Sequence, residues 1–176
     1  MDRYDASFDF KKLLDNGEIV VSNRYTSSNM GHQGSKFSTP EKRRAYFEWL
    51  DIYEHGVFKI PRPNLTIILH VPPEYAQNLL EKKAARKYIN GQARDLLESD
   101  MGHQKRAEQT YLEMAKMFPN YKLIECVRDG EMMSVEEIHK LIWQNILDVM
   151  PDLIGHPETE ALYSGFPPSR EWQMRL

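Results

Sequence analysis

A nearly unbroken apolar run, Leu65-Thr-Ile-Ile-Leu-His-Val71, constrains the fold of this chain more than any other segment. A strand with one face in water alternates apolar and polar residues, whereas a parallel strand covered on both faces is apolar almost throughout. Two further runs of strand length, 18–22 and 121–127, lie before and after it in the chain. We therefore expect three strands in a parallel sheet with helices packed on it.

The segments between these runs predict helices, and several of them carry end signals. A helix over 4–16 is closed by the C-terminal cap pair Asn16-Gly17. Thr39-Pro40 opens an aromatic-rich helix over 40–56. Ser134-Val-Glu-Glu137 is a capping box before the last helix. The remaining expected elements are a helix opened by Pro72-Pro73, a long helix over roughly 95–117, and a polar loop over 23–38 with a helix opening around Met30.

Composition excludes several classes of protein. The chain has 176 residues, of which 41% are hydrophobic and 28% charged, as in ordinary soluble domains. Its net charge of −3 provides no general basic surface, so nucleic-acid binding is not indicated. The single cysteine, Cys126, excludes an intrachain disulfide and suits a reducing compartment. No apolar stretch has the length of a membrane helix or a signal core. These features predict a cytoplasmic protein without a membrane partner.

The segment Ile19–Gly34 carries the clearest pattern of binding chemistry. Arg24 follows the first predicted strand, and ligands of open α/β sheets bind outside the carboxyl ends of strands. A guanidinium there can bind a phosphate through two parallel hydrogen bonds. Polar side chains suited to a small ligand follow it: Ser28, Asn29, His32 and Gln33. A surface loop with one solvated arginine would contain the same residue types, so the residues alone leave both interpretations open.

This segment resembles the thymidylate kinases, which carry Asp-Arg-Tyr/His, then Ser, then Asn or Thr, then Tyr-Gln-Gly after a strand. The order and spacing match from Asn23 to Gly34 without a gap. The resemblance implies that Arg24 binds the phosphate of dTMP, that Asn29 contacts the thymine edge, and that His32 lies beside the deoxyribose. Asn23 replaces the usual Asp and His32 the usual Tyr. The loss of the acidic side chain leaves the electrostatics around Mg²⁺ open.

Two further stretches follow the same family. Asp2-Arg3 opens the first helix, as an acidic or amide residue and an arginine do in thymidylate kinases, and the resemblance implies that Arg3 reaches a thymine carbonyl. Arg3 would also be an ordinary residue of a frayed N-terminus. Pro63–Glu74 follows the family pattern Pro-Asp-Leu-Thr-apolar-apolar-Leu-Asp-Val-Pro-Pro-Glu, which is mainly scaffold. The resemblance also implies that Ser28 contacts the thymine. The expected substrate-binding residues are thus Arg3, Arg24, Ser28, Asn29, His32 and Gln33.

A basic segment over about 82–98 resembles the lid that closes over ATP in this family. Phosphoryl transfer places negative charge on the equatorial oxygens, and positioned cations stabilise that charge. The resemblance implies that Arg86 and Arg94 lie at the transferred phosphoryl group. Asp95 and Glu98 would organise the acceptor phosphate and the metal. A run of charges is also typical of a solvated helix end.

Arg128 and Asp129 follow the last predicted strand. The resemblance implies that the loop at this point lines the adenine of ATP, mainly through its backbone. An ordinary strand-to-helix turn would have the same sequence character.

The chain contains no Gly-x-x-x-x-Gly-Lys-Ser/Thr loop, whose backbone N–H groups cradle ATP phosphates in P-loop enzymes. Thymidylate kinases carry this loop near the N-terminus. The resemblance therefore predicts a nucleoside-monophosphate-kinase-like domain over 1–149 and a loose tail over 150–176. The expected fold is α/β, a three-layer fold of the P-loop NTPase type with a parallel sheet flanked by helices, N-terminally incomplete.

The resemblance implies an enzyme that transfers the γ-phosphoryl group of ATP to dTMP, with Mg²⁺, as a homodimer to which the aromatic helix contributes. We expect its activity to depend on the absent loop. Two alternatives remain open. Asn23 and His32 favour a kinase for another deoxynucleotide, whereas the absent loop favours a non-catalytic nucleotide-binding remnant.

Overall fold

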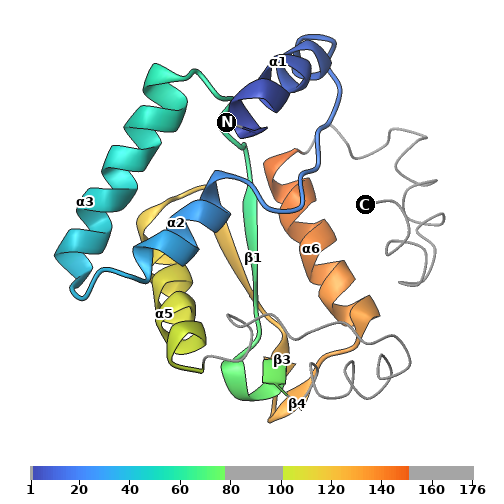
Figure 1. The fold of residues 1–176 in the computed structure, drawn as a ribbon. Coiled ribbons are helices and arrows are strands. Elements are labelled where there is room, and N and C mark those ends of the chain that lie inside the picture. The colour runs from blue at the N-terminus through green and yellow to red at the C-terminus, as the bar shows by residue number, and fades with distance from the viewer. Residues whose placement is uncertain (1, 78–100, 151–176) are drawn as a thin grey trace, which may run out of the picture.

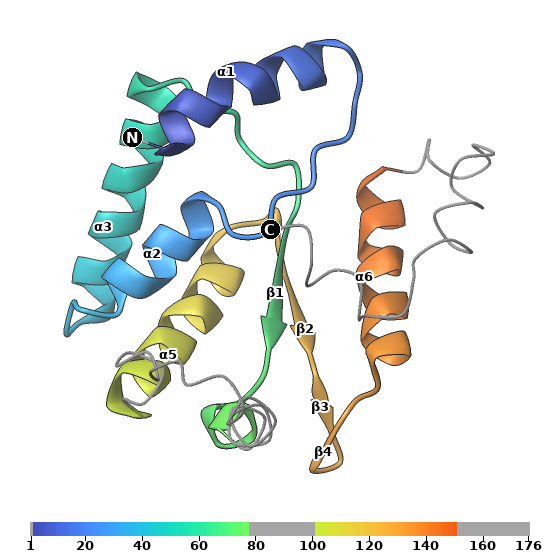
Figure 2. The ribbon, with the colours of Figure 1, turned by 45° about the vertical axis from the view of Figure 1, so that its right-hand side comes forward.

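The computed structural model describes residues 2–77 and 101–150. Its centre is a parallel pair of strands, β1 (Thr66–His70) and β2 (Tyr121–Glu125), with Thr66 opposite Tyr121 and His70 opposite Glu125. Helix α5 (Met101–Met117) packs on one side of the pair and α6 (Val135–Val149) on the other (Figures 1 and 2). The predicted α/β arrangement, a parallel sheet flanked by helices, is confirmed for the described residues.

The predicted first strand is wrong for this structure. Residues 18–22 have no regular secondary structure, although their β-branched side chains favour a strand. Ile19 is 52% exposed and Val21 85% exposed. A strand requires a hydrogen-bonded neighbour, and within the described ranges β1 pairs only with β2. We call residues 18–22 together with the unpaired side of β1 the open edge.

The N-terminal helices follow their end signals. Helix α1 ends where expected, before Gly17, whose φ of 80° is a left-handed conformation suited to glycine. Thr39 caps α3 by accepting a hydrogen bond from the Lys42 N–H at 3.4 Å. Residues 73–77 are helical, as the Pro-Pro pair predicts. The bounds are α1 (Asp2–Asp15), α2 (Thr26–Gly34), α3 (Pro40–Asp51) and the π-helix η1 (Ile52–Val57).

The third predicted strand divides at Cys126, after which a short antiparallel hairpin is formed by β3 (Val127–Arg128) and β4 (Glu131–Met132). Its two-residue turn has positive φ angles at Asp129 (52°) and Gly130 (81°), as in a type I′ turn. The capping box of α6 is confirmed, because Ser134 and Glu137 exchange backbone-to-side-chain hydrogen bonds of 2.9 and 3.2 Å. Cys126 itself is 1% exposed.

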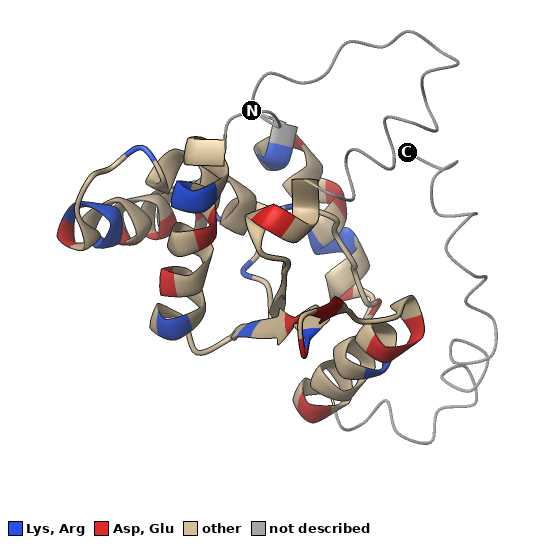
Figure 3. Ribbon diagram, turned by 90° about the horizontal axis from the view of Figure 1, so that it is seen from below, with Lys and Arg blue, Asp and Glu red and all other residues tan. Residues whose placement is uncertain are grey.

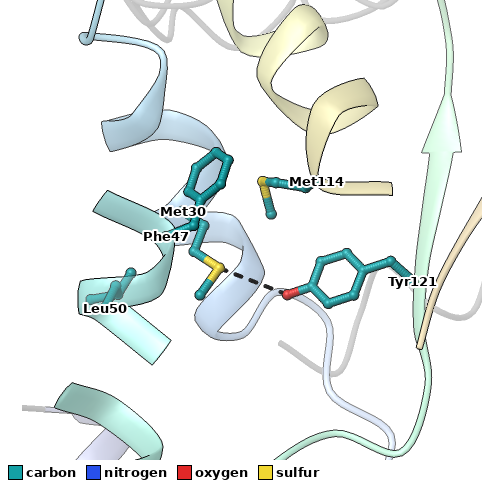
Figure 4. Close-up of a cluster of buried hydrophobic side chains, with 5 residues drawn as sticks. All are labelled: Met30, Phe47, Leu50, Met114 and Tyr121. Carbon is teal, nitrogen blue, oxygen red and sulfur yellow. Dashed lines mark hydrogen bonds between the residues drawn. The ribbon is translucent and has the colours of Figure 1, made fainter. Parts of the chain in front are cut away.

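The main core lies between α2, α3, α5 and β2 (Figure 4). The hydroxyl of Tyr121 donates to the Met30 sulfur at 3.8 Å, and burial raises the pKa of Tyr121 to about 12. Burying each large apolar side chain of this kind stabilises a fold by about 1.5–3 kcal/mol. The side chains that meet here are Met30, Phe47, Leu50, Met114 and Tyr121.

Two glycines allow α2 to approach its neighbours closely. A Cβ atom on Gly31 would lie 2.2 Å from a ring carbon of Tyr111 on α5, and one on Gly34 would lie 2.7 Å from the Phe47 ring on α3. Residues three apart lie on the same side of a helix, so both contacts come from one face of α2. We call α2, α3 and α5 the helix layer.

Charged positions are distributed over α1, α3, α5 and α6, whereas α2 contains no Lys, Arg, Asp or Glu (Figure 3). Among the described residues, no helix is long and apolar enough to cross a membrane.

Candidate functional site

Arg24 lies in the turn that joins the open edge to α2. Its φ of 66° is uncommon for a residue with a side chain, and the Ser22 hydroxyl holds the turn by donating to the Arg24 carbonyl at 3.0 Å. Arg24 is exposed to solvent. Helix α2 starts two residues later without a side-chain cap or an acidic residue in its first turn. The arginine and the positive end of the helix dipole therefore both favour an anion here.

A cleft of about 730 Å³ extends from Arg24 along β1. Its size is in the range of small-molecule sites, roughly 300–1,000 Å³. Arg24 and Ser28 line it from the N-terminal side, and Tyr111 and Glu108 line it from α5. Residues of the open edge and Ile146 of α6 also line it. A ligand at Arg24 would thus place its remaining atoms between the sheet and the helix layer.

Five side chains at this end of the cleft form what we call the Arg24 cluster: Arg24, Ser28, His32, His103 and Tyr111. The His32 and His103 rings stack with centroids 5.9 Å apart and planes inclined by 11°. The Tyr111 ring meets His32 edge-on at 6.2 Å. Burial, then Arg24, then His103 lower the pKa of His32, whereas burial raises the pKa of Tyr111 against the effects of Ser28 and Arg24. At neutral pH the His32 imidazole is therefore neutral and Tyr111 is a phenol.

Sequence reasoning missed His103. Its spacing to Tyr111 is two helical turns, which places both side chains on one face of α5. From that spacing, the contact between His103 and His32 could be predicted only if α5 were already known to pack on α2. The contact depends on the close helix approach at Gly31, which is tertiary information.

Arg3 is placed differently from the Arg24 cluster. Its guanidinium donates two hydrogen bonds to Glu54 of η1, at 2.6 and 3.1 Å, and the Glu54 side chain is only 6% exposed. Burying a carboxylate requires such a partner.

Of the predicted substrate-binding residues with described positions, Arg24 and Ser28 line the cleft, whereas the others do not: Arg3, Asn29, His32 and Gln33.

His70 forms an ionic cluster at the carboxyl end of β1, where the family pattern has Asp. Its Nδ1 lies 2.5 Å from Glu125 of β2 and its Nε2 lies 2.8 Å from Glu108 of α5. Burial lowers the pKa of His70, but the hydrogen bonds and charges of the two carboxylates outweigh it and raise the pKa overall. A protonated His70 therefore donates to both carboxylates and ties β1, β2 and α5 together. Residue type and spacing did not predict this cluster.

Arg128 and Asp129 belong to the β3–β4 hairpin. Arg128 forms an ion pair with Glu137 at 3.8 Å and lines a cavity of about 330 Å³ between β2 and α6. Asp129 occupies the turn, and the Tyr75 hydroxyl donates to the adjacent Gly130 carbonyl at 2.8 Å. Their predicted role at the adenine stays a prediction.

The predicted phosphoryl-transfer residues lie outside the described residues: Arg86, Arg94, Asp95 and Glu98. The predicted lid over 82–98 and almost all of the predicted tail lie outside them as well. Over 2–77 and 101–150, no three His, Cys, Asp or Glu side chains are arranged to hold a metal ion. The described residues at the cleft supply an arginine and an uncapped helix N-terminus, both of which favour an anion.

Three curated relatives show what the chain is similar to. A probable thymidylate kinase of Thermococcus gammatolerans is 27% identical over 154 residues, covering 86% of this chain and 57% of that protein. For the probable thymidylate kinase of Thermococcus onnurineus the identity is 30% over 131 residues, covering 73% and 52%. For that of Methanococcoides burtonii it is 26% over 141 residues, covering 80% and 61%. The chain spans about half to three-fifths of the length of these relatives. No family model and no solved structure matches it.

Proposed function

Since the chain belongs to the thymidylate kinase family, we propose that it provides the acceptor site and lid of an enzyme that transfers the γ-phosphoryl group of ATP to dTMP, giving dTDP. The observation that carries this proposal is the position of Arg24. It lies in a left-handed turn before the uncapped N-terminus of α2, at the end of a cleft of about 730 Å³. This geometry favours a phosphate at Arg24 and the rest of a nucleotide along the cleft.

We assign the nucleotide contacts as follows. Arg24 binds the acceptor phosphate, Ser28 and Asn29 read the thymine edge, and His32 lies beside the sugar with Gln33 near it. The ion pair with Glu54 engages Nε and Nη2 of Arg3, so we assign the Nη1 group of Arg3 to a thymine carbonyl. The sugar side distinguishes this chain from the family pattern, because His32 replaces a tyrosine. We therefore expect this chain to reject ribonucleotides less strongly than relatives with Tyr do. The alternative is that it prefers another deoxynucleotide.

The donor side of the proposal lies largely outside the described residues. Arg86 and Arg94 would stabilise the transferred phosphoryl group, Asp95 and Glu98 would position the acceptor, and ATP would enter as its Mg²⁺ complex. Positioning and charge stabilisation supply most of the catalysis in phosphoryl transfer. Arg128 and Asp129 would lie at the adenine.

We propose further that activity requires a phosphate-cradling loop, which the 176 residues do not contain. The open edge supports this, because exposed Ile19 and Val21 flank a cleft beside the unpaired side of β1. An additional parallel strand there would bury these side chains and lead into such a loop. The reaction would take place in the cytoplasm.

A homodimer is part of the proposal. Tyr46, Trp49 and Tyr53 stack in sequence along α3 and η1, with centroid distances of 6.0 and 5.2 Å. Trp49 is 55% exposed, although aromatic side chains of this size usually lie buried or in interfaces. This aromatic face supports packing of helix against helix between two copies.

The test couples ADP formation to dTMP addition. We expect negligible turnover for the 176-residue chain, and restored turnover when a segment that carries the phosphate-cradling loop of a thymidylate kinase is fused to its N-terminus. Typical kinase rates are about 1–100 per second. A fusion that binds dTMP and ATP without turnover would favour the non-catalytic alternative. Equal rates on dTMP and dCMP would overturn the thymidylate assignment.

A further inference from the structure

The stacked histidines of the Arg24 cluster bring two titratable rings from different helices together. His32 comes from α2 and His103 from the first turn of α5, with ring centroids 5.9 Å apart. Two imidazolium ions at this distance repel each other, so charging both is unfavourable. His103 therefore disfavours the protonated form of His32.

The described groups around His32 favour the neutral state. Arg24 in the preceding turn and His103 on α5 both lower the pKa of His32, in addition to burial, and Tyr111 on α5 is uncharged at neutral pH. On α3, the other helix packed against α2, Arg43 is paired with Glu113 of α5 at 2.6 and 2.7 Å. Among the described residues, the charged groups that bear on His32 are thus positive, and they disfavour its protonated form.

A phosphate bound at Arg24 would reverse the sign of the electrostatic potential at His32. A phosphate monoester carries a charge between about −1.5 and −2 at pH 7, which more than offsets one guanidinium. A nearby negative charge favours the protonated imidazole. We propose that His32, stacked on His103, takes up one proton from solvent when Arg24 binds a phosphate monoester, with His103 as a positioning residue that keeps His32 neutral until the ligand arrives.

This inference rests on the proposed function for the identity of the ligand, dTMP. Calorimetric titration of dTMP into the full chain near pH 7.5, in buffers of different ionisation enthalpy, measures the protons taken up. We expect about half to one proton per dTMP, and a dissociation constant that falls by up to about tenfold per pH unit as the pH is lowered. Thymidine, which lacks the phosphate, should bind without uptake.

Variants separate the roles of the two rings. His32→Gln should abolish most of the uptake. His103→Gln should move the pH midpoint of the affinity change upward, because the remaining ring loses a repulsive neighbour. A purely structural role for His103 would instead weaken binding equally at every pH. His139→Gln on α6, outside the cluster, should leave uptake and midpoint unchanged.

Two outcomes overturn the inference: dTMP binding with equal proton uptake in the original chain and in His32→Gln, or a midpoint unmoved in His103→Gln. Failure of dTMP to bind at any pH would count against the proposed function instead. In that case, NMR titration of the histidines without ligand still tests the pair. The His32 resonance should titrate below the ordinary histidine value of about 6.5 and shift upward in His103→Gln. An unshifted midpoint overturns the pairing.

Discussion

The helix layer and the open edge contain apolar side chains of similar kinds in opposite environments. In the helix layer, Phe47 is 1% exposed and Leu50 5% exposed, whereas Val21 on the open edge is 85% exposed. Helices satisfy their backbone hydrogen bonds internally and need only a packed face. A strand needs a neighbour before its apolar side chains can be buried. Packing of helix on helix therefore buries the apolar side chains of the helix layer, whereas the open edge leaves its apolar side chains exposed in the described structure.

The largest expected effect is on stability in the helix layer. Leu50→Ala should lower the free energy of unfolding by about 2–5 kcal/mol, because it leaves a cavity in a packed core. Val21→Ala should change it by less than about 0.5 kcal/mol, as at other exposed positions. Urea denaturation of both variants measures the difference. A large loss for Val21→Ala would break the comparison, since it would mean that the open edge is covered in solution.

Arg24 lies where the two regions meet, and its removal should affect ligand binding next most strongly. Arg24→Ala should weaken dTMP binding by about 1.5–3 kcal/mol, the range for hydrogen bonds to charged groups. Arg24→Lys should recover only part of this, since an ammonium cannot reproduce the planar fork. Calorimetric titration measures both. Arg44→Ala, which removes an exposed arginine paired with Glu48 on α3, is the matched control and should bind dTMP normally. Unchanged binding in Arg24→Ala would return Arg24 to the role of a solvated surface residue.

The close contact between α2 and α5 gives the third prediction. Gly31→Ala should destabilise the chain by about 1–3 kcal/mol, the usual cost of overpacking. The reason is that its Cβ would lie 2.2 Å from the Tyr111 ring. Gly56→Ala is the control, because a Cβ there would meet its nearest neighbour at 3.7 Å. Equal midpoints of thermal unfolding for the two variants would show that the α2–α5 contact is loose.

The smallest expected effect is the pH dependence of the free energy of unfolding that comes from His70 in the sheet. The pKa of His70 is raised in the folded chain, so its stabilising contribution is fully present below the unfolded value of about 6.5. That contribution is lost as the pH rises through the raised folded pKa. The difference in free energy of unfolding between the original chain and His70→Gln should therefore shrink from pH 6 to pH 9. His55→Gln serves as the comparison, and a difference that grows with pH would refute the protonated His70 cluster.

Local signals predicted much of the fold. Asn16-Gly17, Thr39-Pro40 and the Ser134 capping box each fixed a helix end through contacts within a few residues, and the structure agrees. The strand prediction over 18–22 failed because strand formation depends on a partner elsewhere. The π-helical turn η1 was also missed, since its hydrogen-bond pattern differs from that of α3 without a distinct sequence pattern.

The residues of the candidate site also separate into those that the local sequence predicted and those whose contacts depend on tertiary packing. Arg24 and Ser28 were predicted from a contiguous segment, and they line the cleft together. The pairing of Arg3 with Glu54 joins residues 51 positions apart, and that of His70 with Glu108 joins residues 38 apart. Such contacts are set by how helices and strands pack. Residue type and spacing along the chain do not reveal them.

Cys126 makes the junction between β2 and the β3–β4 hairpin chemically addressable. It is the sole thiol of the chain, and burial raises its pKa, so it is shielded from alkylation in the closed structure. Its labelling rate divided by that of an unfolded thiol gives the fraction of time this junction is open. A single mass shift thus reports exposure of the thiol at the end of the sheet without introducing any probe. Ligands that stabilise the folded chain can be ranked by how far they slow that one reaction.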